Sequence, residues 1–295
     1  MPAFCFEDAQ SQPLTEIPLM IGERSCTVLW KGAPDEEGVL APLMLWDPAI
    51  ALVEELDAFV SPSVKQRRFL VTGRKAGATE LRAVEFGRKD SSRQFGALSI
   101  RVRPPQETDV DMVYRGTFLV WHRSLPKSLA AAGPLMFAAT SGTQGLQVAD
   151  RQKEGQKEDG PAGPLPETKY VFVARLDAAQ NSVEAANKRG QQAIDNHERG
   201  IQFLRIGGNG PVDTNWGTMR VRLEPLGPTY GRDGFFLHNS HKGFSHGCIE
   251  IGRTLDGRDF FDTLLLYAHE QGKANLVVQV KYPYPKMSTR GDTLR

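Results

Sequence analysis

Three histidines and one cysteine lie close together in the stretch FFLHNSHKGFSHGCIEIG, residues 235–252. They are His238, His241, His246 and Cys248, in a chain that has six histidines and three cysteines in all. A thiol attacks a carbonyl carbon well only as a thiolate, and a neighbouring imidazole can take its proton and return it to the leaving group. Cysteine and histidine are also the preferred ligands of zinc. Three interpretations are therefore open: a cysteine nucleophile with its base, a metal site, or a hydrogen-bonded patch without chemistry.

The glycine that precedes the cysteine favours the first interpretation. Gly247 lets the backbone turn tightly, so that its amide and that of Cys248 can approach a developing oxyanion. The run FFLH is of β-type and ends at His238, while CIEIG begins another strand. On an extended strand the rings of His238 and His241 would point to opposite faces, which disfavours zinc. The alternative without chemistry is that Cys248 is a small residue of the hydrophobic core.

Most of the chain around this stretch has the alternation of apolar and polar residues that is typical of strands. This pattern predicts strands at 112–123, 134–142, 169–176, 201–208, 217–227 and 275–283. Capping residues and helical spacing predict two helices, at 181–200 and 257–272. The charged, Gly- and Pro-rich segment 149–167 is expected to be a solvated loop.

The first hundred residues have a different pattern and predict a separate domain. Short β-type runs at 25–32, 67–73, 79–87 and 97–105 predict antiparallel strands, and Pro104-Pro105 marks a linker. One helix is predicted at 46–63, because Asp47 can cap it, Pro48 suits its first position and Pro62 closes it. We therefore expect a mainly β protein. A β-sandwich-like accessory domain spans 1–105, and a β-rich domain with one or two covering helices spans 106–295.

Two stretches carry resemblances to known families. The motif SHGC, with a histidine upstream on an apolar strand, resembles the active site of the L,D-transpeptidase (YkuD-type) family. Three upstream segments also resemble that family in order: FLVWHRSLPKSLAAAGPLMFAATSG, GPLPETKYVF and YGRDGFFLHNS. His238 lies ten residues before Cys248, a short spacing similar to the branch exported as type VI secretion effectors. In the first domain, FLVTGRKAGATELRAVEF with GALSIRVRP after it resembles a bacterial immunoglobulin-like repeat.

The resemblance to the L,D-transpeptidases implies a role for each residue of the motif. Cys248 would be the nucleophile and His238 the general base. His246 would shape the site, Ser245 would donate a local hydrogen bond, and the amides of Gly247 and Cys248 would form the oxyanion hole. Expected substrate-binding residues are Tyr230, Arg232, Asn239 and Glu250. The chain departs from the family in Asn239, where a glycine is common, in Glu250, where Asn, Asp or Arg is usual nearby, and in Thr168, which replaces a glycine.

The same resemblance implies an activity and a substrate. The enzyme would be an L,D-carboxypeptidase or L,D-transpeptidase that acts on the stem peptides of peptidoglycan, with neither a metal nor an organic cofactor. Two rivals remain: a resident transpeptidase that forms cell-wall crosslinks, and a non-catalytic wall-binding or zinc-bound adaptor.

Charge and sequence patterning bear on partners and location. Lys+Arg 36 against Asp+Glu 35 leaves a net charge of +1, so no basic field favours nucleic acid. No run approaches the ~18 apolar residues of a membrane span, and the N-terminus lacks the pattern of a Sec signal peptide. Three cysteines without paired spacing fit synthesis in the cytoplasm. The resemblance adds secretion into the periplasm of a target cell, with a secretion-spike component and a cognate immunity protein as further partners.

Overall fold

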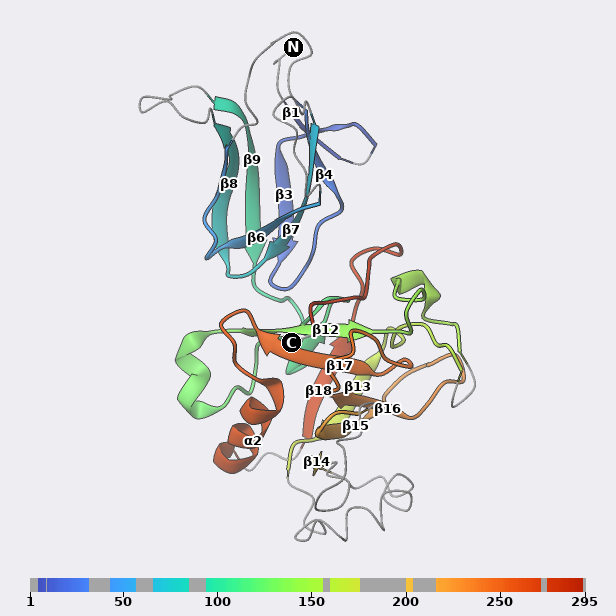
Figure 1. The fold of residues 1–295 in the computed structure, drawn as a ribbon. Helices are drawn as coiled ribbons and strands as arrows, with labels where there is room; N and C mark the ends of the chain where they lie inside the picture. Colours follow the sequence, from blue (N-terminus) through green and yellow to red (C-terminus); the bar gives the residue numbers. More distant parts are fainter. Residues whose placement is uncertain are drawn as a thin grey trace. The chain divides into compact units, whose positions relative to one another are not determined.

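The computed structural model describes residues 5–8, 10–31, 43–56, 66–84, 94–155, 160–175, 200–203, 216–271 and 275–293. The chain divides into two compact units, Met1–Pro105 and Gln106–Arg295, and the division follows the proline pair. Strands dominate both units, as Figure 1 shows. The expectation of a mainly β protein with few helices is confirmed.

The N-terminal unit consists of two β-sheets. One has five strands in the order β2-β1-β4-β7-β6, and the other has four in the order β3-β9-β8-β5. The strands are β1 (Cys5–Glu7), β2 (Pro13–Leu14), β3 (Glu16–Met20), β4 (Val28–Lys31), β5 (Leu43–Leu45), β6 (Ala51–Glu55), β7 (Gln66–Gly73), β8 (Gly77–Val84) and β9 (Gln94–Arg103). Each sheet buries alternate residues, and β1 of one sheet contacts β9 of the other. The sheets thus form the layers of a sandwich around buried side chains that include Trp30, Phe69, Leu81 and Ile100.

The helix predicted at 46–63 is wrong over its described part. Asp47 does act as a cap: its side chain accepts a hydrogen bond from the amide of Ala49 at 2.8 Å, but the cap closes only a turn. The chain then extends as β6, which pairs with β7 from Ala51↔Gly73 to Glu55↔Phe69. Pairing with a long neighbouring strand outweighs the local helical preference of this segment. Residues 57–65 lie outside the described part of the chain.

The C-terminal unit is built on one nine-stranded sheet in the order β13-β18-β10-β11-β12-β17-β16-β15-β14. Its strands are β10 (Met112–Tyr114), β11 (Phe118–Trp121), β12 (Leu135–Ser141), β13 (Lys169–Val173), β14 (Gln202–Phe203), β15 (Met219–Pro225), β16 (Phe235–His238), β17 (Ile249–Thr254) and β18 (Asn275–Val280). Because β13 also pairs with β15, the sheet closes into a ring that leaves β14 outside it. The single strand expected at 112–123 is a hairpin of β10 and β11, which turns at Gly116 with φ +90°.

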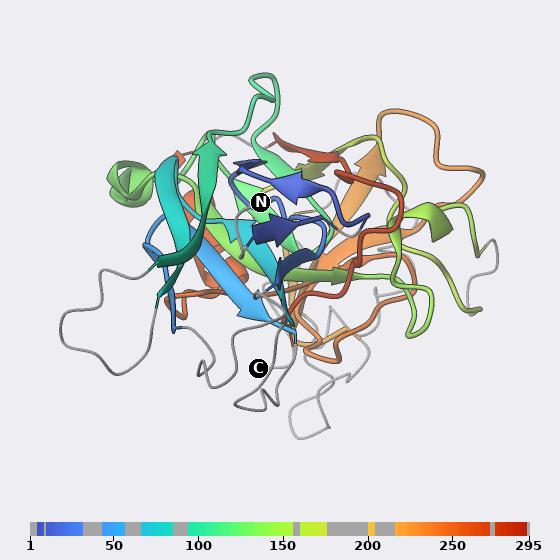
Figure 2. The ribbon, with the colours of Figure 1, turned by 90° about the horizontal axis from the view of Figure 1, so that it is seen from above.

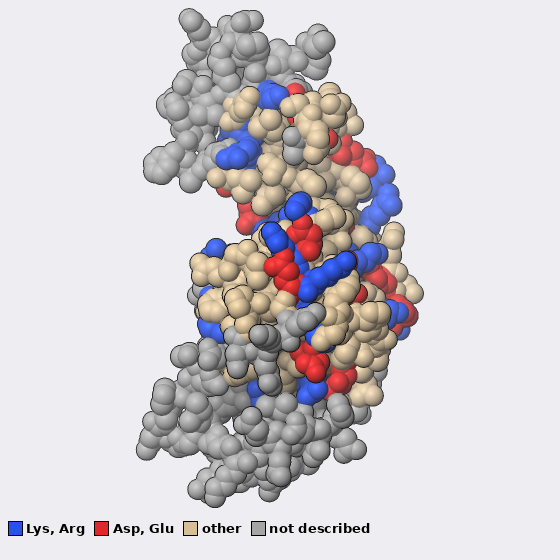
Figure 3. Space-filling view, turned by 90° about the vertical axis from the view of Figure 1, so that its right-hand side faces the viewer, with Lys and Arg blue, Asp and Glu red and all other residues tan. Residues whose placement is uncertain are grey.

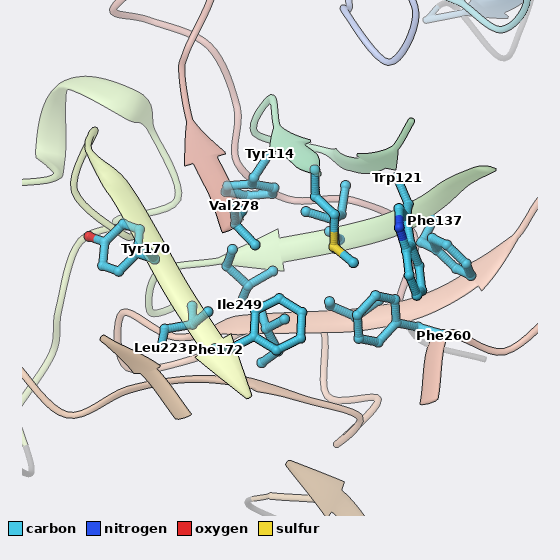
Figure 4. Close-up of a cluster of buried hydrophobic side chains, with 14 of the residues drawn as sticks. Tyr114, Trp121, Phe137, Tyr170, Phe172, Leu223, Ile249, Phe260 and Val278 are labelled. Carbon is cyan, nitrogen blue, oxygen red and sulfur yellow. The ribbon is translucent and has the colours of Figure 1, made fainter. Parts of the chain in front are cut away.

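The ring encloses the main apolar core of this unit. Side chains alternate along each strand, so every second residue of the ring points inward. The helix α2 (Phe260–Gln271) adds four more side chains to the same core, and Figure 4 shows Phe260 beside Trp121 and Phe137. The ring centroids of Phe137 and Phe260 are 5.2 Å apart. The inward-facing set includes Leu119, Phe172, Leu223, Leu237, Ile249 and Val278.

The helical predictions for this unit have different outcomes. The helix expected at 257–272 is α2, whereas the helix expected at 181–200 lies almost wholly outside the described residues. A short 3-10 helix, η1 (Lys127–Ala132), is the green coil on the left of Figure 2. A second, η2 (Ala149–Arg151), begins the segment that was expected to be a solvated loop. No helix in the described part of the chain is long and apolar enough to cross a bilayer.

Candidate active site

Cys248 and His238 lie on the face of the sheet that is turned away from the core. Strands β16 and β17 are parallel neighbours, with Leu237 opposite Ile249 and His238 opposite Glu250. Leu237 and Ile249 both belong to the apolar core. Because successive side chains of a strand point to opposite faces, His238, Cys248 and Glu250 share the other face. The structure therefore brings the expected nucleophile and base to neighbouring strands on one side of the sheet.

Burial governs the protonation of both groups. Cys248 is 5% exposed and His238 is 2% exposed. Loss of hydration raises the pKa of the Cys248 thiol to about 11, although the cations of Arg220, Arg232 and Lys242 act in the opposite direction. Burial also lowers the pKa of His238 to about 3, and Lys242 and Arg220 reinforce this shift. The resting pair at neutral pH is therefore an uncharged thiol beside an uncharged imidazole.

The imidazole of His238 lies among groups that the sequence analysis did not single out. Its ring makes an edge contact with Trp216, with centroids 5.4 Å apart, and Arg220 is its partner on β15. The guanidinium carbon of Arg220 lies 4.8 Å from the ring centroid of Trp216 and 4.7 Å from that of Phe236. The alternation in MRVRLEP would have placed Arg220 on the same face as its partner on the next strand, so this residue was within reach of sequence reasoning.

Among the residues that the structure describes, one ring nitrogen of His238 has no hydrogen-bond partner. Its Nδ1 is buried and makes no hydrogen bond to any residue that the structure describes. A buried polar atom left unpaired costs about 1–3 kcal/mol, so such atoms in native structures call for an explanation. A general base that must accept and release a proton is one such explanation.

The turn before Cys248 is fixed from several sides. Gly247 has φ +94°, and a Cβ at this position would overlap Nη2 of Arg232, so only glycine fits. The hydroxyl of Ser245 donates a hydrogen bond to the carbonyl of Cys248 at 2.5 Å, which is the local donor role expected of it. The hydroxyl of Ser141, at the end of β12, donates to the same carbonyl at 2.7 Å. Cys248 thus sits on a backbone that two hydroxyls and a close-packed glycine hold in place.

Glu250 fastens the loop between the two strands rather than facing solvent. Its side chain is fully buried and accepts hydrogen bonds from the amides of Lys242 at 2.8 Å and Gly243 at 2.7 Å. The hydroxyls of Ser240 and Thr293 donate to the same carboxylate. We expected Glu250 to contact substrate, but these four donors surround its oxygens. Its position suits it to hold the loop that carries the nucleophile.

The other expected substrate-binding residues have different surroundings. Asn239 is 7% exposed, and its Oδ1 accepts hydrogen bonds from the amides of Thr218 and Met219 at 2.9 Å each, so its side chain is also committed to the protein. Arg232 is buried as well. Tyr230 is 42% exposed and has Nζ of Lys153 5.2 Å from its ring centroid. Of these expected residues, Tyr230 presents the most surface to a ligand.

The remaining histidines of the motif face different partners. His246 is exposed, and its Nδ1 lies 3.2 Å from the carbonyl oxygen of Gly160. Nδ1 of His241 lies 3.2 Å from the carbonyl oxygen of Thr293. Within the described ranges, no three His, Cys, Asp or Glu side chains gather into a cluster that could hold a metal ion. His246 borders the turn of the nucleophile, whereas His241 is tied to the segment that follows Ser288.

Comparison with known proteins gives no family. No protein-family model matches the chain, and no curated protein matches it. Among solved structures, domains 4 and 5 of the S-layer protein SbsC match with a TM-score of 0.23 and 13% identity over 30% of this chain. Amebosin matches with a TM-score of 0.21 and 17% identity over 30% of this chain and 89% of its own. The S-layer protein rSbsC matches with a TM-score of 0.25 and 10% identity over 73% of this chain and 22% of its own.

These three likenesses carry no argument about fold or activity, because all three TM-scores lie below 0.5. The chain spans 47% of the first of these structures, that of SbsC domains 4 and 5. The inference about function therefore rests on the residues of the site itself.

Proposed function

We propose that this chain is a cysteine enzyme that acts on the stem peptides of peptidoglycan, as an L,D-carboxypeptidase or L,D-transpeptidase. One observation carries the proposal. His238 ends β16 and Cys248 directly precedes the parallel neighbour β17, and both lie on the face away from the core, with a glycine turn directly before the sulfur. A core cysteine would point toward Leu237 and Ile249 instead. The resemblance of SHGC and the upstream histidine to the L,D-transpeptidase motif names the substrate class.

The first half of the proposed reaction forms an acyl-enzyme. Sγ of Cys248 attacks the carbonyl carbon of the peptide bond that precedes the terminal D-amino acid, and the thiol proton passes to His238. The amides of Gly247 and Cys248 are the proposed donors to the oxyanion. When the C–N bond breaks, His238 returns the proton to the departing amine. The products are a free D-amino acid and a thioester on Cys248.

The second half releases the shortened stem. Water attacks the thioester carbonyl and gives up a proton to His238, which leaves a new carboxylate and restores the thiol. An amine from a D-amino acid or a second stem can attack in place of water, which exchanges or crosslinks the peptide. All these outcomes need the same nucleophile and base and no cofactor.

The proposed setting is antibacterial. The short spacing between His238 and Cys248 is similar to that of exported effectors, so we propose delivery into the periplasm of a target cell. A secretion-spike component and a cognate immunity protein are the proposed protein partners.

Digestion of purified muropeptides tests the proposal. Tetrapeptide muropeptides are incubated with the full chain, with and without a free D-amino acid, and the products are read by mass spectrometry. We expect the enzyme to remove the terminal residue in water and to replace it when the D-amino acid is present. Cys248→Ala should show neither reaction. Products that link two stems would favour the resident crosslinking enzyme. Intact muropeptides together with binding to isolated cell walls would favour the adaptor and overturn the proposal.

A further inference from the structure

Arg232 is a buried cation whose guanidinium is fully placed by backbone carbonyls. Arg232 lies just before β16 in the sequence, and it is 5% exposed. Nη1 donates to the carbonyl oxygens of Gln152 at 2.6 Å and Pro164 at 2.8 Å. Nη2 donates to that of Gly163 at 2.9 Å. Burying a charge is costly unless it is hydrogen-bonded, so three acceptors at this one side chain indicate a built arrangement.

The acceptors belong to the segment that the sequence predicted to be a solvated loop. On both sides of its undescribed residues 156–159, this segment is packed against the protein. The amide of Ala162 donates to Oγ1 of Thr143 at 3.0 Å. A Cβ on Gly163 would overlap the carbonyl of Arg151, so the two arms of the segment are in backbone contact there. Arg232 bonds to both arms, through Gln152 on one and Gly163 and Pro164 on the other.

The same guanidinium lies against the turn that precedes Cys248. A Cβ added to Gly247 would overlap Nη2 of Arg232 and would lie 3.4 Å from the carbonyl oxygen of Gly163. The positive charge also stabilises the Cys248 thiolate, because Arg232 acts to lower the pKa of that thiol against the larger effect of burial. Arg232 therefore touches the loop and the turn at once.

We propose that Arg232 is a positioning residue of the site, which clamps residues 151–155 and 160–164 onto the Gly247–Cys248 turn and keeps a fixed positive charge beside the sulfur. The proposal rests on the proposed function for the reaction it serves. It replaces the role expected from the sequence, in which Arg232 would bind a carboxylate of the stem peptide. A guanidinium that already donates to three carbonyls and sits under a glycine is occupied by the protein.

Two substitutions separate the charge of Arg232 from its shape. Arg232→Lys keeps the charge but loses the fork that reaches both arms of the segment. Arg232→Gln loses both, and Arg253→Gln removes an exposed arginine from β17 as the matched control. Alkylation of Cys248 by iodoacetamide is followed from pH 6 to 11, and the peptide that contains Cys248 is read by mass spectrometry, so Cys5 and Cys26 do not interfere. The other charged or titratable groups near Cys248 are His238, Arg220, Lys242, His241 and Glu250, and they are unchanged in every variant.

Arg232→Gln should move the alkylation profile to higher pH, so that alkylation at pH 8 falls about three- to tenfold, since one unit of pKa corresponds to tenfold in thiolate. Arg232→Lys should restore most of this rate, yet its kcat on tetrapeptide muropeptides should stay at least about tenfold below wild type, because the turn is no longer clamped. Arg253→Gln should match wild type in both assays.

An unchanged alkylation profile in Arg232→Gln would overturn the proposal, as would wild-type kcat in Arg232→Lys. If Arg232→Gln does not fold, the lysine variant alone decides through its kcat. The alkylation assay needs no muropeptide, so it can fail while the peptidase activity stands. Conversely, absence of any muropeptide cleavage by wild type would refute the proposed function and leave the alkylation result intact.

Discussion

The sulfur of Cys248 and the imidazole of His238 rest uncharged because both are withdrawn from water. In the reaction proposed here, such an imidazole takes the proton as the sulfur attacks, rather than stabilising a preformed thiolate before substrate arrives. Free thiolate is therefore scarce at neutral pH, and the thiol is protected from oxidants and stray electrophiles until a carbonyl is positioned beside it.

Removal of the sulfur should abolish catalysis without loss of the fold. Cys248→Ala replaces one small buried residue by another, so we expect a free energy of unfolding within about 1–2 kcal/mol of wild type. Release of D-amino acid from tetrapeptide muropeptides should fall at least about 10³-fold. Activity within tenfold of wild type would show that another group attacks the peptide.

Acid should destabilise the protein through His238. Burial lowers its pKa to about 3 in the folded state, far below the ordinary value of 6.5. Between pH 3 and pH 6.5 the unfolded chain therefore binds a proton at this side chain and the folded chain does not. Stability from this group is present above pH 6.5 and is lost as the pH falls, by up to about 1.4 kcal/mol per pH unit. Urea unfolding at pH 7, 6 and 5 should show a shallower loss in His238→Gln than in wild type.

The control for this pH dependence is His269→Gln, which changes an exposed histidine on α2. It should keep the wild-type slope. Equal slopes in all three proteins would mean that His238 is protonated as easily in the folded state as in the unfolded state.

At the scale of elements, the loop between β16 and β17 gathers three of its hydrogen bonds on one carboxylate. Glu250 accepts hydrogen bonds from two amides of that loop and from two hydroxyls, one of them on Thr293. Parallel strands are usually joined by a dozen or more residues, whereas only residues 239–248 join these two. A connection this short needs internal support, and Glu250 supplies it.

Glu250→Ala should loosen the loop and lower stability together. Several buried donors lose their acceptor, so we expect a loss of about 2–4 kcal/mol in the free energy of unfolding and faster hydrogen exchange at the amides of Lys242 and Gly243. Glu224→Ala is the control, because Glu224 pairs with Arg222 at a partly exposed site on β15 and should cost about 1 kcal/mol or less. Similar losses from both variants would contradict the special role of Glu250.

Sequence patterns predicted the strands and helices of this protein better than they predicted the contacts of the site residues. Strand alternation located most of the described strands, and helical spacing located α2, because period and burial coincide there. The prediction failed at β6, where Asp47 and Pro48 start a turn and pairing with β7 decides the rest. The sequence motif also predicted that His238 and Cys248 lie near each other, and the pairing of β16 with β17 brings them to adjoining positions. The bonds that commit Asn239 and Arg232 to the protein join them to residues 20 to 80 positions away, and one of the four to Glu250 comes from Thr293, 43 positions away. No local pattern contains such distant partners.

At the scale of the whole molecule, the surface carries both signs of charge. Figure 3 shows Lys and Arg side chains next to Asp and Glu on the face it draws, and exposed ion pairs such as Lys286–Asp150 accompany this mixture. The two units each have their own sheets and their own buried core. The candidate site lies entirely within residues 106–295.

Toxicity should depend on the compartment in which the chain acts. Peptidoglycan lies outside the cytoplasmic membrane, so expression in the cytoplasm of a Gram-negative host should be tolerated. The same chain with an added periplasmic signal peptide should cause swelling or lysis, which microscopy and optical density would measure. Cys248→Ala and His238→Ala should abolish this effect. Equal toxicity from both compartments, or lysis that survives Cys248→Ala, would favour a different target or mere binding.

The C-terminal unit should be sufficient once delivery is supplied. A signal peptide joined to residues 106–295 should lyse cells as the full chain does, because every residue of the candidate site and its core belongs to this unit. Loss of toxicity with normal periplasmic levels of the shorter chain, measured by immunoblot, would mean that the N-terminal unit takes part in the reaction.

The bond between Thr293 and Glu250 also has a consequence for the order of events during synthesis. Thr293 follows Glu250 by 43 residues in the chain and donates to the carboxylate that holds the loop between β16 and β17. A ribosome that has just added Cys248 to the chain has therefore not yet made one of the donors that complete the loop, nor β18, which pairs with β10 and β13 in the ring. The nascent chain carries the thiol and the imidazole but not their geometry. The loop that positions Cys248 and His238 can therefore be completed only after translation has passed Thr293.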